Sequence, residues 1–209
     1  MITVHHLDNS RSQRILWLLE ELGLDYEIIQ YKRDPVTRFA PASLKAIHPL
    51  GKSPIVTDGD VVVIESGAII DYILRTYGHG RLAPAAGSPD YNSYVQWMHY
   101  AEGSAMLPVL LALYVGRLGE AGLPLQPRIK SEAANHLGYM NAALGKQDYF
   151  VGNTFSAADI QLSFVVEAAT ARGQIDDSLG NLKHFAERIH ARPAYVRAVE
   201  RGGPYQLGR

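Results

Sequence analysis

The chain contains no cysteine among its 209 residues. Disulfide bonds, thiol nucleophiles supplied by the chain and cysteine-ligated metal sites are therefore excluded. Long apolar runs are also missing, because no stretch reaches the roughly 18 residues that a membrane-spanning helix needs. The N-terminus opens with an alternating, strand-like pattern rather than a secretory leader. We therefore expect a soluble, cytoplasmic protein with no membrane partner.

An excess of either charge is also missing, since 20 Lys and Arg residues are matched by 21 Asp and Glu residues. A nucleic-acid-binding protein typically carries a basic stripe, so we expect no nucleic-acid partner. The eight histidines show no His-Glu-x-x-His or similar spacing, and we expect no metal site. What the chain does have is 47% apolar residues, which suffices for one large or two small domains with a buried core.

The first 78 residues alternate between strand and helix patterns. A helical pattern whose apolar residues share one broad face lies between two strand patterns, which indicates a βαβ unit with parallel strands. Two later β-branched runs flank Asp58-Gly59, which predicts an antiparallel hairpin. The expected elements are, in order, strand 2–6, helix 11–22, strand 26–30, a short helix 42–47, the hairpin and helix 67–77.

Residues 79–90 are rich in Gly, Pro and Ala and read as a linker between domains. No strand pattern follows them. The helical patterns after the linker cover residues 91–118, with a bend expected at Pro108, and 127–144, 157–171, 182–191 and 193–200. We therefore predict an α/β domain over 1–78 and an all-helical domain over 91–209.

Three segments together resemble the cytosolic glutathione S-transferase superfamily, and the resemblance covers essentially the whole chain. They are "NSRSQRILWLLEELGLDYE" from Asn9, "HPLGKSPIVTDGDVVVIESGAIIDYI" from His48 and "NTFSAADI" from Asn153. The sequence looks closest to serine-type bacterial and fungal members. The resemblance implies a thioredoxin-like N-terminal domain followed by a helical bundle. It also implies a homodimer that conjugates glutathione, as co-substrate without a further cofactor, to small electrophiles.

The segment "KSPIV" implies one part of a glutathione site. In the thioredoxin-like fold the proline, here Pro54, follows a cis peptide bond, and the backbone of the preceding residue, here Ser53, pairs with the cysteinyl part of glutathione as a short added strand. The family often has Gln or Lys at the position of Lys52, bonding the backbone or carboxylate of the tripeptide. An ordinary edge-strand proline and a solvated lysine are the structural alternatives.

Glu65-Ser66 stands where a strand runs directly into a helix, and a helix N-terminus offers free N–H groups to an anion. The resemblance implies that Ser66 holds the γ-glutamyl carboxylate of glutathione and that Glu65 meets its α-amino group. Plain helix capping by Ser66 is compatible with this role. By contrast, Ser156 and Asp159 have the spacing of a capping box, which serves folding rather than chemistry.

The polar cluster at the start of the first helix is the candidate catalytic element. The nucleophile must be thiolate, whereas a free thiol with a pKa of about 8.5 is mostly protonated at neutral pH. A hydroxyl donor at a helix start favours the thiolate by a hydrogen bond. Ser10 is our first choice as that donor. Asn9, which aligns with the catalytic hydroxyl of serine-type relatives, and Ser12 stay open, as does a cluster that only caps the helix.

The resemblance makes Tyr100, Met106 and Tyr114 candidate residues of an electrophile pocket, although such a stripe is more often core. Two alternative functions stay open beside conjugation. Asn9 keeps glutathione-dependent reduction of peroxides or disulfides possible, because relatives with that activity use Asn or Thr at this helix start. The same fold also serves as a non-catalytic binding module, against which the intact Ser53-Pro54 and Glu65-Ser66 pairs argue.

Overall fold

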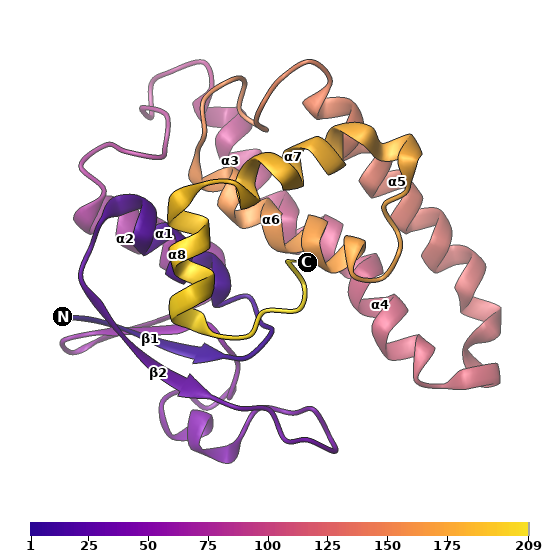
Figure 1. Ribbon diagram of the computed structural model, residues 1–209, viewed down its shortest axis with the longest axis horizontal. Helices are drawn as coiled ribbons and strands as arrows, with labels where there is room; N and C mark the ends of the chain where they lie inside the picture. Colours follow the sequence, from indigo (N-terminus) through magenta and orange to yellow (C-terminus); the bar gives the residue numbers. More distant parts are fainter. Residues whose placement is uncertain (209) are drawn as a thin grey trace. The chain divides into compact units, whose positions relative to one another are not determined.

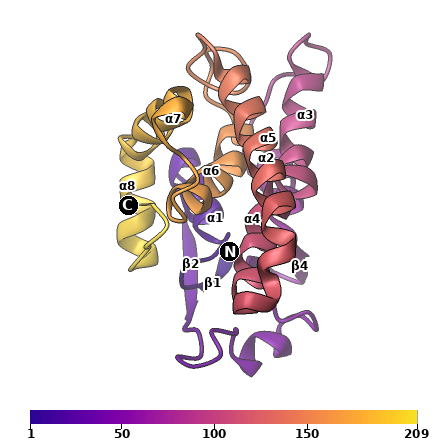
Figure 2. The same ribbon diagram turned by 90° about the vertical axis from the view of Figure 1, so that its right-hand side faces the viewer.

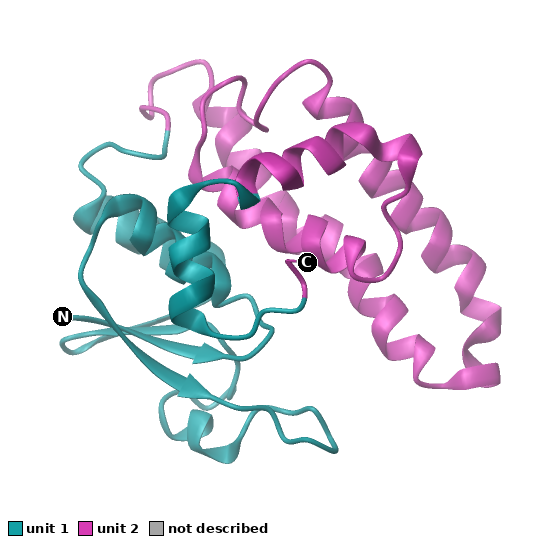
Figure 3. Ribbon diagram, in the orientation of Figure 1, with its two compact units in different colours: residues 1–83, 190–206 teal, residues 84–189, 207–209 magenta. Residues whose placement is uncertain are grey.

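The computed structural model describes residues 1–208, which form two compact units (Figure 3). The first unit comprises residues 1–83 and 190–206, and the second comprises 84–189 with the described residues from 207 onward. The sequence patterns placed residues 190–206 in the helical domain. In the structure they belong instead to the first unit, because the helix at the end of the chain packs on the first helix.

The first unit is built on a four-stranded sheet in the order β2-β1-β3-β4. β1 pairs in parallel with β2 and antiparallel with β3, and β3 and β4 form an antiparallel hairpin. The parallel βαβ unit (Figure 1) is thereby confirmed, and so is the hairpin at Asp58-Gly59. The bounds are Ile2–Leu7 for β1, Tyr26–Tyr31 for β2, Ile55–Asp58 for β3 and Val61–Ile64 for β4.

Helix α1 spans Gln13–Leu22 and buries nearly its whole length, from Ile15 through Leu19. It ends at Gly23, whose positive φ of 63° lets its N–H reach the last carbonyls of the helix. The helix begins at Gln13 rather than at the expected Arg11, because residues 8–12 form a separate turn. Helix α2, Ser66–Tyr77, follows β4, and a short 3₁₀ helix covers Ala42–Ala46.

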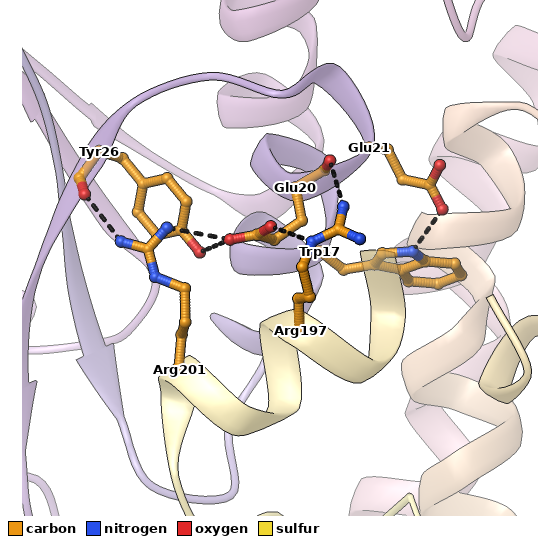
Figure 4. A network of polar contacts seen from close by, with 6 residues as sticks. All are labelled: Trp17, Glu20, Glu21, Tyr26, Arg197 and Arg201. Atoms are coloured by element: carbon orange, nitrogen blue, oxygen red, sulfur yellow. Dashed lines mark hydrogen bonds and ion pairs between the residues drawn. The ribbon is translucent and has the colours of Figure 1, made fainter. Parts of the chain in front are cut away.

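Helix α8, Pro193–Gly202, packs against α1 and is joined to it by charged side chains (Figure 4). Glu20 of α1 accepts from the guanidinium groups of Arg197, at 2.8 Å, and Arg201, at 2.9 Å. The Arg201 guanidinium also lies 3.8 Å from the ring centre of Tyr26, whose hydroxyl donates to Glu20. Several partly buried contacts of this kind stabilise the packing of α8 on α1 more than a single exposed ion pair would.

The second unit consists of helices. Its first long helix is α3, Tyr91–Tyr100, which continues through a π-helical turn, Ala101–Ala105, into α4, Met106–Gly116. Pro108 has no N–H for the carbonyl of Ser104, and the wider turn lies just before it. Figure 2 shows α5 alongside α4. The remaining elements are 3₁₀ helix Gly119–Leu125, α5 Gln126–Leu144, α6 Ala157–Thr170, 3₁₀ helix Asp177–Leu179 and α7 Gly180–His190.

The capping box at the start of α6 is confirmed. Asp159 Oδ2 accepts from the backbone N–H of Ser156 at 2.8 Å, and Oδ1 accepts from the N–H of Phe150 at 2.9 Å. Asp159 is fully buried, and burial raises the pKa of its carboxyl to about 6 despite these bonds. None of the helices over residues 1–208 is long and apolar enough to cross a membrane.

Candidate functional site

The turn between β1 and α1 holds a buried chain of hydroxyl groups. Ser10 is 5% and Ser12 0% exposed, and their Oγ atoms lie 2.7 Å apart. The Ser12 N–H donates to Ser10 Oγ at 3.2 Å, which fixes the position of that oxygen. Ser10 Oγ in turn lies 3.4 Å from Ser53 Oγ, on the loop before β3. The structure therefore brings together one candidate for the sulfur contact and the residue before Pro54.

The side chain of Ser12 does not cap α1. Ser12 is the N-cap residue, yet its backbone is helical and its side chain makes no capping bond. Its Oγ instead accepts from the N–H of Leu7 at 3.3 Å and lies 2.8 Å from Nδ1 of His6. These bonds run back toward the sheet, away from the helix. The alternative in which the cluster only caps the helix therefore does not describe the side chain of Ser12.

Ser53 and Pro54 are joined by a cis peptide bond, as the thioredoxin-like fold implies. The hydroxyl of Ser53 donates to the carbonyl of His5 at 2.9 Å, which ties this loop to the end of β1. Pro54 is buried and Ser53 is half-buried. Lys52, the residue before them, is exposed.

Asn9 has a structural role in the turn before α1. Its φ of 50° places it in the left-handed region, which Asn tolerates better than most residues. Its side-chain oxygen accepts from the N–H of Gln206 at 2.7 Å, so Asn9 joins the turn to the chain's last residues. The side chain of Arg33 donates to the carbonyls of Asp8, at 2.9 Å, and Asn9, at 3.4 Å.

Glu65 and Ser66 stand at the start of α2, where β4 ends. Glu65 is the N-cap residue, with φ 69° and ψ 122°, and Ser66 is the first helical residue. The expectation of Ser66 as N-cap is therefore off by one position, because the sharp turn already occurs at Glu65. Ser66 is 4% exposed, whereas Glu65 is exposed. The N–H groups of this first turn and the positive end of the helix dipole are the kind of groups that bind an anion.

The candidate pocket residues of the second unit differ in exposure. Met106 is buried, and Tyr114 is 57% exposed. The hydroxyl of Tyr100 lies 2.7 Å from Nδ1 of His136, and its ring packs edge-on against Trp97. Tyr100 is thus part of an aromatic cluster inside the unit.

His6 is the residue near the site that sequence reasoning missed. Its ring is 3% exposed, and its pKa is lowered, chiefly by burial, against the opposing effects of the Asp8 charge and a hydrogen bond to the backbone of Gly202. No motif marks it, because a histidine on a strand usually indicates a packed core position. Among the described residues, no group of three or more His, Asp or Glu side chains could hold a metal ion.

Comparison with known proteins covers both parts of the chain. Residues 1–75 match the family model for the glutathione S-transferase N-terminal domain, and residues 125–196 match that for the C-terminal domain. Glutathione S-transferase 3 of Schizosaccharomyces pombe is 37% identical over an alignment of 215 positions that covers 96% of this chain and 88% of that protein. Glutathione S-transferase 1 of Saccharomyces cerevisiae is 32% identical, over 82% of each chain.

A solved structure resembles the whole chain. It is that of a glutathione S-transferase from Actinobacillus pleuropneumoniae, with a TM-score of 0.90 and 36% sequence identity. The alignment covers 100% of this chain and 96% of that one. This chain therefore agrees with that protein in fold as well as in sequence.

Proposed function

Because the chain belongs to the glutathione S-transferase family, we propose that it conjugates the thiolate of glutathione to small electrophilic compounds. The observation that carries the proposal is the 3.4 Å separation of the Ser10 and Ser53 hydroxyl oxygens. A cysteinyl residue paired with the backbone of Ser53 has its sulfur within reach of Ser10. The residue proposed to bind glutathione, Ser53, thus lies next to the proposed hydrogen-bond donor, Ser10.

The γ-glutamyl end of glutathione is a zwitterion, and the start of α2 offers a partner for each charge. Ser66 provides a hydroxyl and an N–H at the positive end of the helix dipole for the carboxylate. Glu65 provides a carboxylate for the α-amino group. Lys52, exposed before Ser53, is placed to meet the backbone or the glycyl carboxylate of the tripeptide. Glutathione is then the co-substrate, and no further cofactor is invoked.

Ser10 supplies the activation. A hydroxyl that donates to sulfur favours the thiolate over the thiol, and each pKa unit by which it lowers the thiol pKa corresponds to about 1.4 kcal/mol. The thiolate is the nucleophile, and binding it beside the electrophile removes the entropy cost of their encounter. We assign this role to Ser10 rather than to Asn9, since Ser10 Oγ lies 3.4 Å from Ser53 Oγ, whereas the side chain of Asn9 is turned to Gln206 by the bond to its oxygen.

We also propose that the protein is a cytoplasmic homodimer with a detoxifying role. Helix α4 carries three exposed apolar side chains at the spacing of one helix face, Leu107, Leu111 and Tyr114, and the exposed Leu118 follows just after the helix. Exposed apolar patches of this kind mark contacts with other molecules. A second copy of the chain is the partner that the family relationship favours.

The proposed function is tested by glutathione binding and by conjugation. Calorimetry should show binding of glutathione and of S-methylglutathione, and both affinities should fall in Ser66→Ala. A conjugation assay with an aryl halide, an enone and an epoxide should give turnover with at least one of them. Ser163→Ala, which removes an equally buried hydroxyl from α6, is the matched control and should leave binding unchanged. Absence of glutathione binding in the folded protein would overturn the proposal.

A further inference from the structure

An unbroken row of hydrogen-bonding groups leads from the proposed sulfur position to a buried histidine. Ser10 Oγ lies 2.7 Å from Ser12 Oγ, and Ser12 Oγ lies 2.8 Å from Nδ1 of His6. All three side chains are 5% exposed or less. The row therefore begins beside Ser53 and ends inside the protein, out of reach of bulk water.

The far side of the His6 ring identifies which nitrogen carries a proton in the neutral state. A hydrogen bond to the backbone of Gly202 raises the pKa of His6, as donation from the ring to a carbonyl does. A Cβ built on Gly202 would lie 3.3 Å from Nε2, so Nε2 is the nitrogen that faces this backbone. With its proton on Nε2, the neutral ring offers the lone pair of Nδ1 to Ser12.

The direction of the hydroxyl protons follows from this assignment. Ser12 Oγ already accepts the N–H of Leu7, and its single proton goes to His6 Nδ1. The single proton of Ser10 has two acceptors within reach, Ser53 Oγ at 3.4 Å and Ser12 Oγ at 2.7 Å, and we place it on the shorter contact to Ser12. Ser53 has its proton on the carbonyl of His5 and offers none to Ser10. Before ligand binds, Ser10 thus turns a lone pair, not a proton, toward the place of the sulfur.

We propose that His6 receives the proton that the glutathione thiol loses, through Ser10 and Ser12. This inference rests on the proposed function. The S–H proton passes to Ser10 Oγ, the proton of Ser10 passes to Ser12 Oγ, and the proton of Ser12 passes to His6 Nδ1. The S–H bond breaks and an N–H bond forms, while each hydroxyl exchanges one proton for another. The products are a thiolate and an imidazolium, and His6 is a positioning residue that acts through the two serines.

The transfer leaves every donor with a partner. The hydroxyl of Ser10 now donates to sulfur, Ser12 donates to Ser10, and both nitrogens of His6 donate, to Ser12 and to Gly202. Bonds that all run the same way toward an anion strengthen one another. In the free protein the hydrogen bonds are donated in the opposite direction, from Ser10 to Ser12 and from Ser12 to His6. Transfer of the thiol proton reverses that direction.

The surroundings of His6 favour a neutral ring before the proton transfer and a charged ring after it. Burial, the largest effect, lowers its pKa and keeps the ring uncharged in the free protein. After the transfer, the negative charge of Asp8 and the carbonyl of Gly202 favour the imidazolium, as does the new thiolate. The Cβ position of Gly202 that lies 3.3 Å from Nε2 of His6 also lies 3.0 Å from Oε1 of Gln13, which carries no charge.

The proposal predicts where the proton goes when bound glutathione ionises. Thiolate formation is followed by ultraviolet absorbance, and proton release by calorimetry in buffers of different ionisation enthalpy. We expect close to zero protons released per thiolate formed in the parent protein, against about one when the proton leaves for solvent. In Ser12→Ala and His6→Asn, which break the row, about one proton should be released per thiolate, or the thiolate should be lost.

Two controls separate this inference from the proposed function and from loss of folding. S-methylglutathione has no thiol proton, and it should bind the parent, Ser12→Ala and His6→Asn within about twofold of one another, since none of its contacts is changed. Ser163→Ala should release protons as the parent does. If S-methylglutathione and glutathione both fail to bind the parent, the proposed function is overturned, and the inference with it.

Histidine ¹⁵N spectra of the parent protein give a second test that needs no variant to fold. Nδ1 of His6 should become protonated when glutathione binds and should stay unprotonated with S-methylglutathione. If glutathione binds as thiolate while Nδ1 stays unprotonated and about one proton per thiolate reaches the buffer, the inference is wrong although the proposed function stands.

Discussion

The backbone N–H of Gln206 donates to the side-chain oxygen of Asn9 over 2.7 Å, which joins residues 197 positions apart in the chain. This bond gives Asn9 a structural duty beside the candidate sulfur contact. It also explains why the turn before α1 holds several polar side chains. Asn9 bonds the end of the chain and Ser12 bonds β1, whereas Ser10 is the residue proposed to contact the sulfur.

The first prediction separates Ser10 from Asn9. Ser10→Ala should lower kcat/KM for conjugation by about 10- to 100-fold, because a hydrogen bond to a charged group contributes about 1.5–3 kcal/mol. Asn9→Gly keeps the left-handed backbone and removes the bond to Gln206, so it should lower Tm with little change in kcat. Steady-state kinetics and thermal melts check both. The reverse pattern, in which Asn9→Gly loses the activity and Ser10→Ala keeps it, would reassign the sulfur contact.

The second prediction concerns the attachment of α8. Burial acts to raise the pKa of Glu20, but hydrogen bonds from Arg197, Tyr26 and Arg201 together lower it below its ordinary value of 4.5. A carboxyl whose pKa is depressed by folding stabilises the fold above its unfolded pKa, and this contribution is lost as pH falls through the folded value.

The difference in Tm between the parent and Glu20→Gln should therefore be full at neutral pH and shrink as pH falls from about 5 toward 3. Thermal melts over this range measure it. Glu27→Gln, which changes an exposed acid on β2, is the control and should follow the parent at each pH. A Tm difference that stays constant down to pH 3 would show that the charge of Glu20 does not stabilise the packing of α8 on α1.

The third prediction tests the close packing at the end of α8. A Cβ at Gly202 would lie 2.8 Å from Cδ1 of Leu16 and 3.0 Å from Oε1 of Gln13. Gly202→Ala should therefore destabilise the protein by about 1–3 kcal/mol, as overpacking does. Gly138→Ala, in the middle of α5 with open space around it, should instead stabilise by up to about 1 kcal/mol. Equal effects of the two changes in denaturant melts would contradict the packing at Gly202.

The fourth prediction concerns the capping box. Ser156→Ala should cost about 1 kcal/mol of unfolding free energy, because one donor at the start of α6 loses its partner. The kcat for conjugation should stay within about twofold of the parent, since the box is a structural element. Urea melts and steady-state assays measure the two quantities. A large loss of kcat in a protein of unchanged stability would give Ser156 a part in the chemistry.

The sheet could be predicted from the sequence because its signals are local. A helix between two strand patterns gives parallel strands, and Asp58-Gly59 between β-branched runs gives a hairpin. The capping box at Ser156 is likewise contained in four residues. Each of these features depends on neighbours in sequence, and the structure confirms each of them.

The arrangement around Ser10 could not be predicted in the same way. Its neighbours Ser53 and Ser12 meet it only after β1 and β3 have paired, and His6 gains its contact with Gly202 only after α8 has docked. The membership of residues 190–206 in the first unit has the same cause. The pattern of α8 indicates a helix, but the surface on which it packs is decided by distant partners such as Glu20.

The most direct test of the account is a pH titration of glutathione bound to the protein, followed by the ultraviolet absorbance of the thiolate. With Ser10 beside the sulfur, the pKa of the bound thiol should lie clearly below the value of about 8.5 for a free thiol, and Ser10→Ala should raise it again. A bound thiol whose pKa equals that of free glutathione, in the parent as in Ser10→Ala, would contradict activation by Ser10 and leave a site that binds glutathione without activating it.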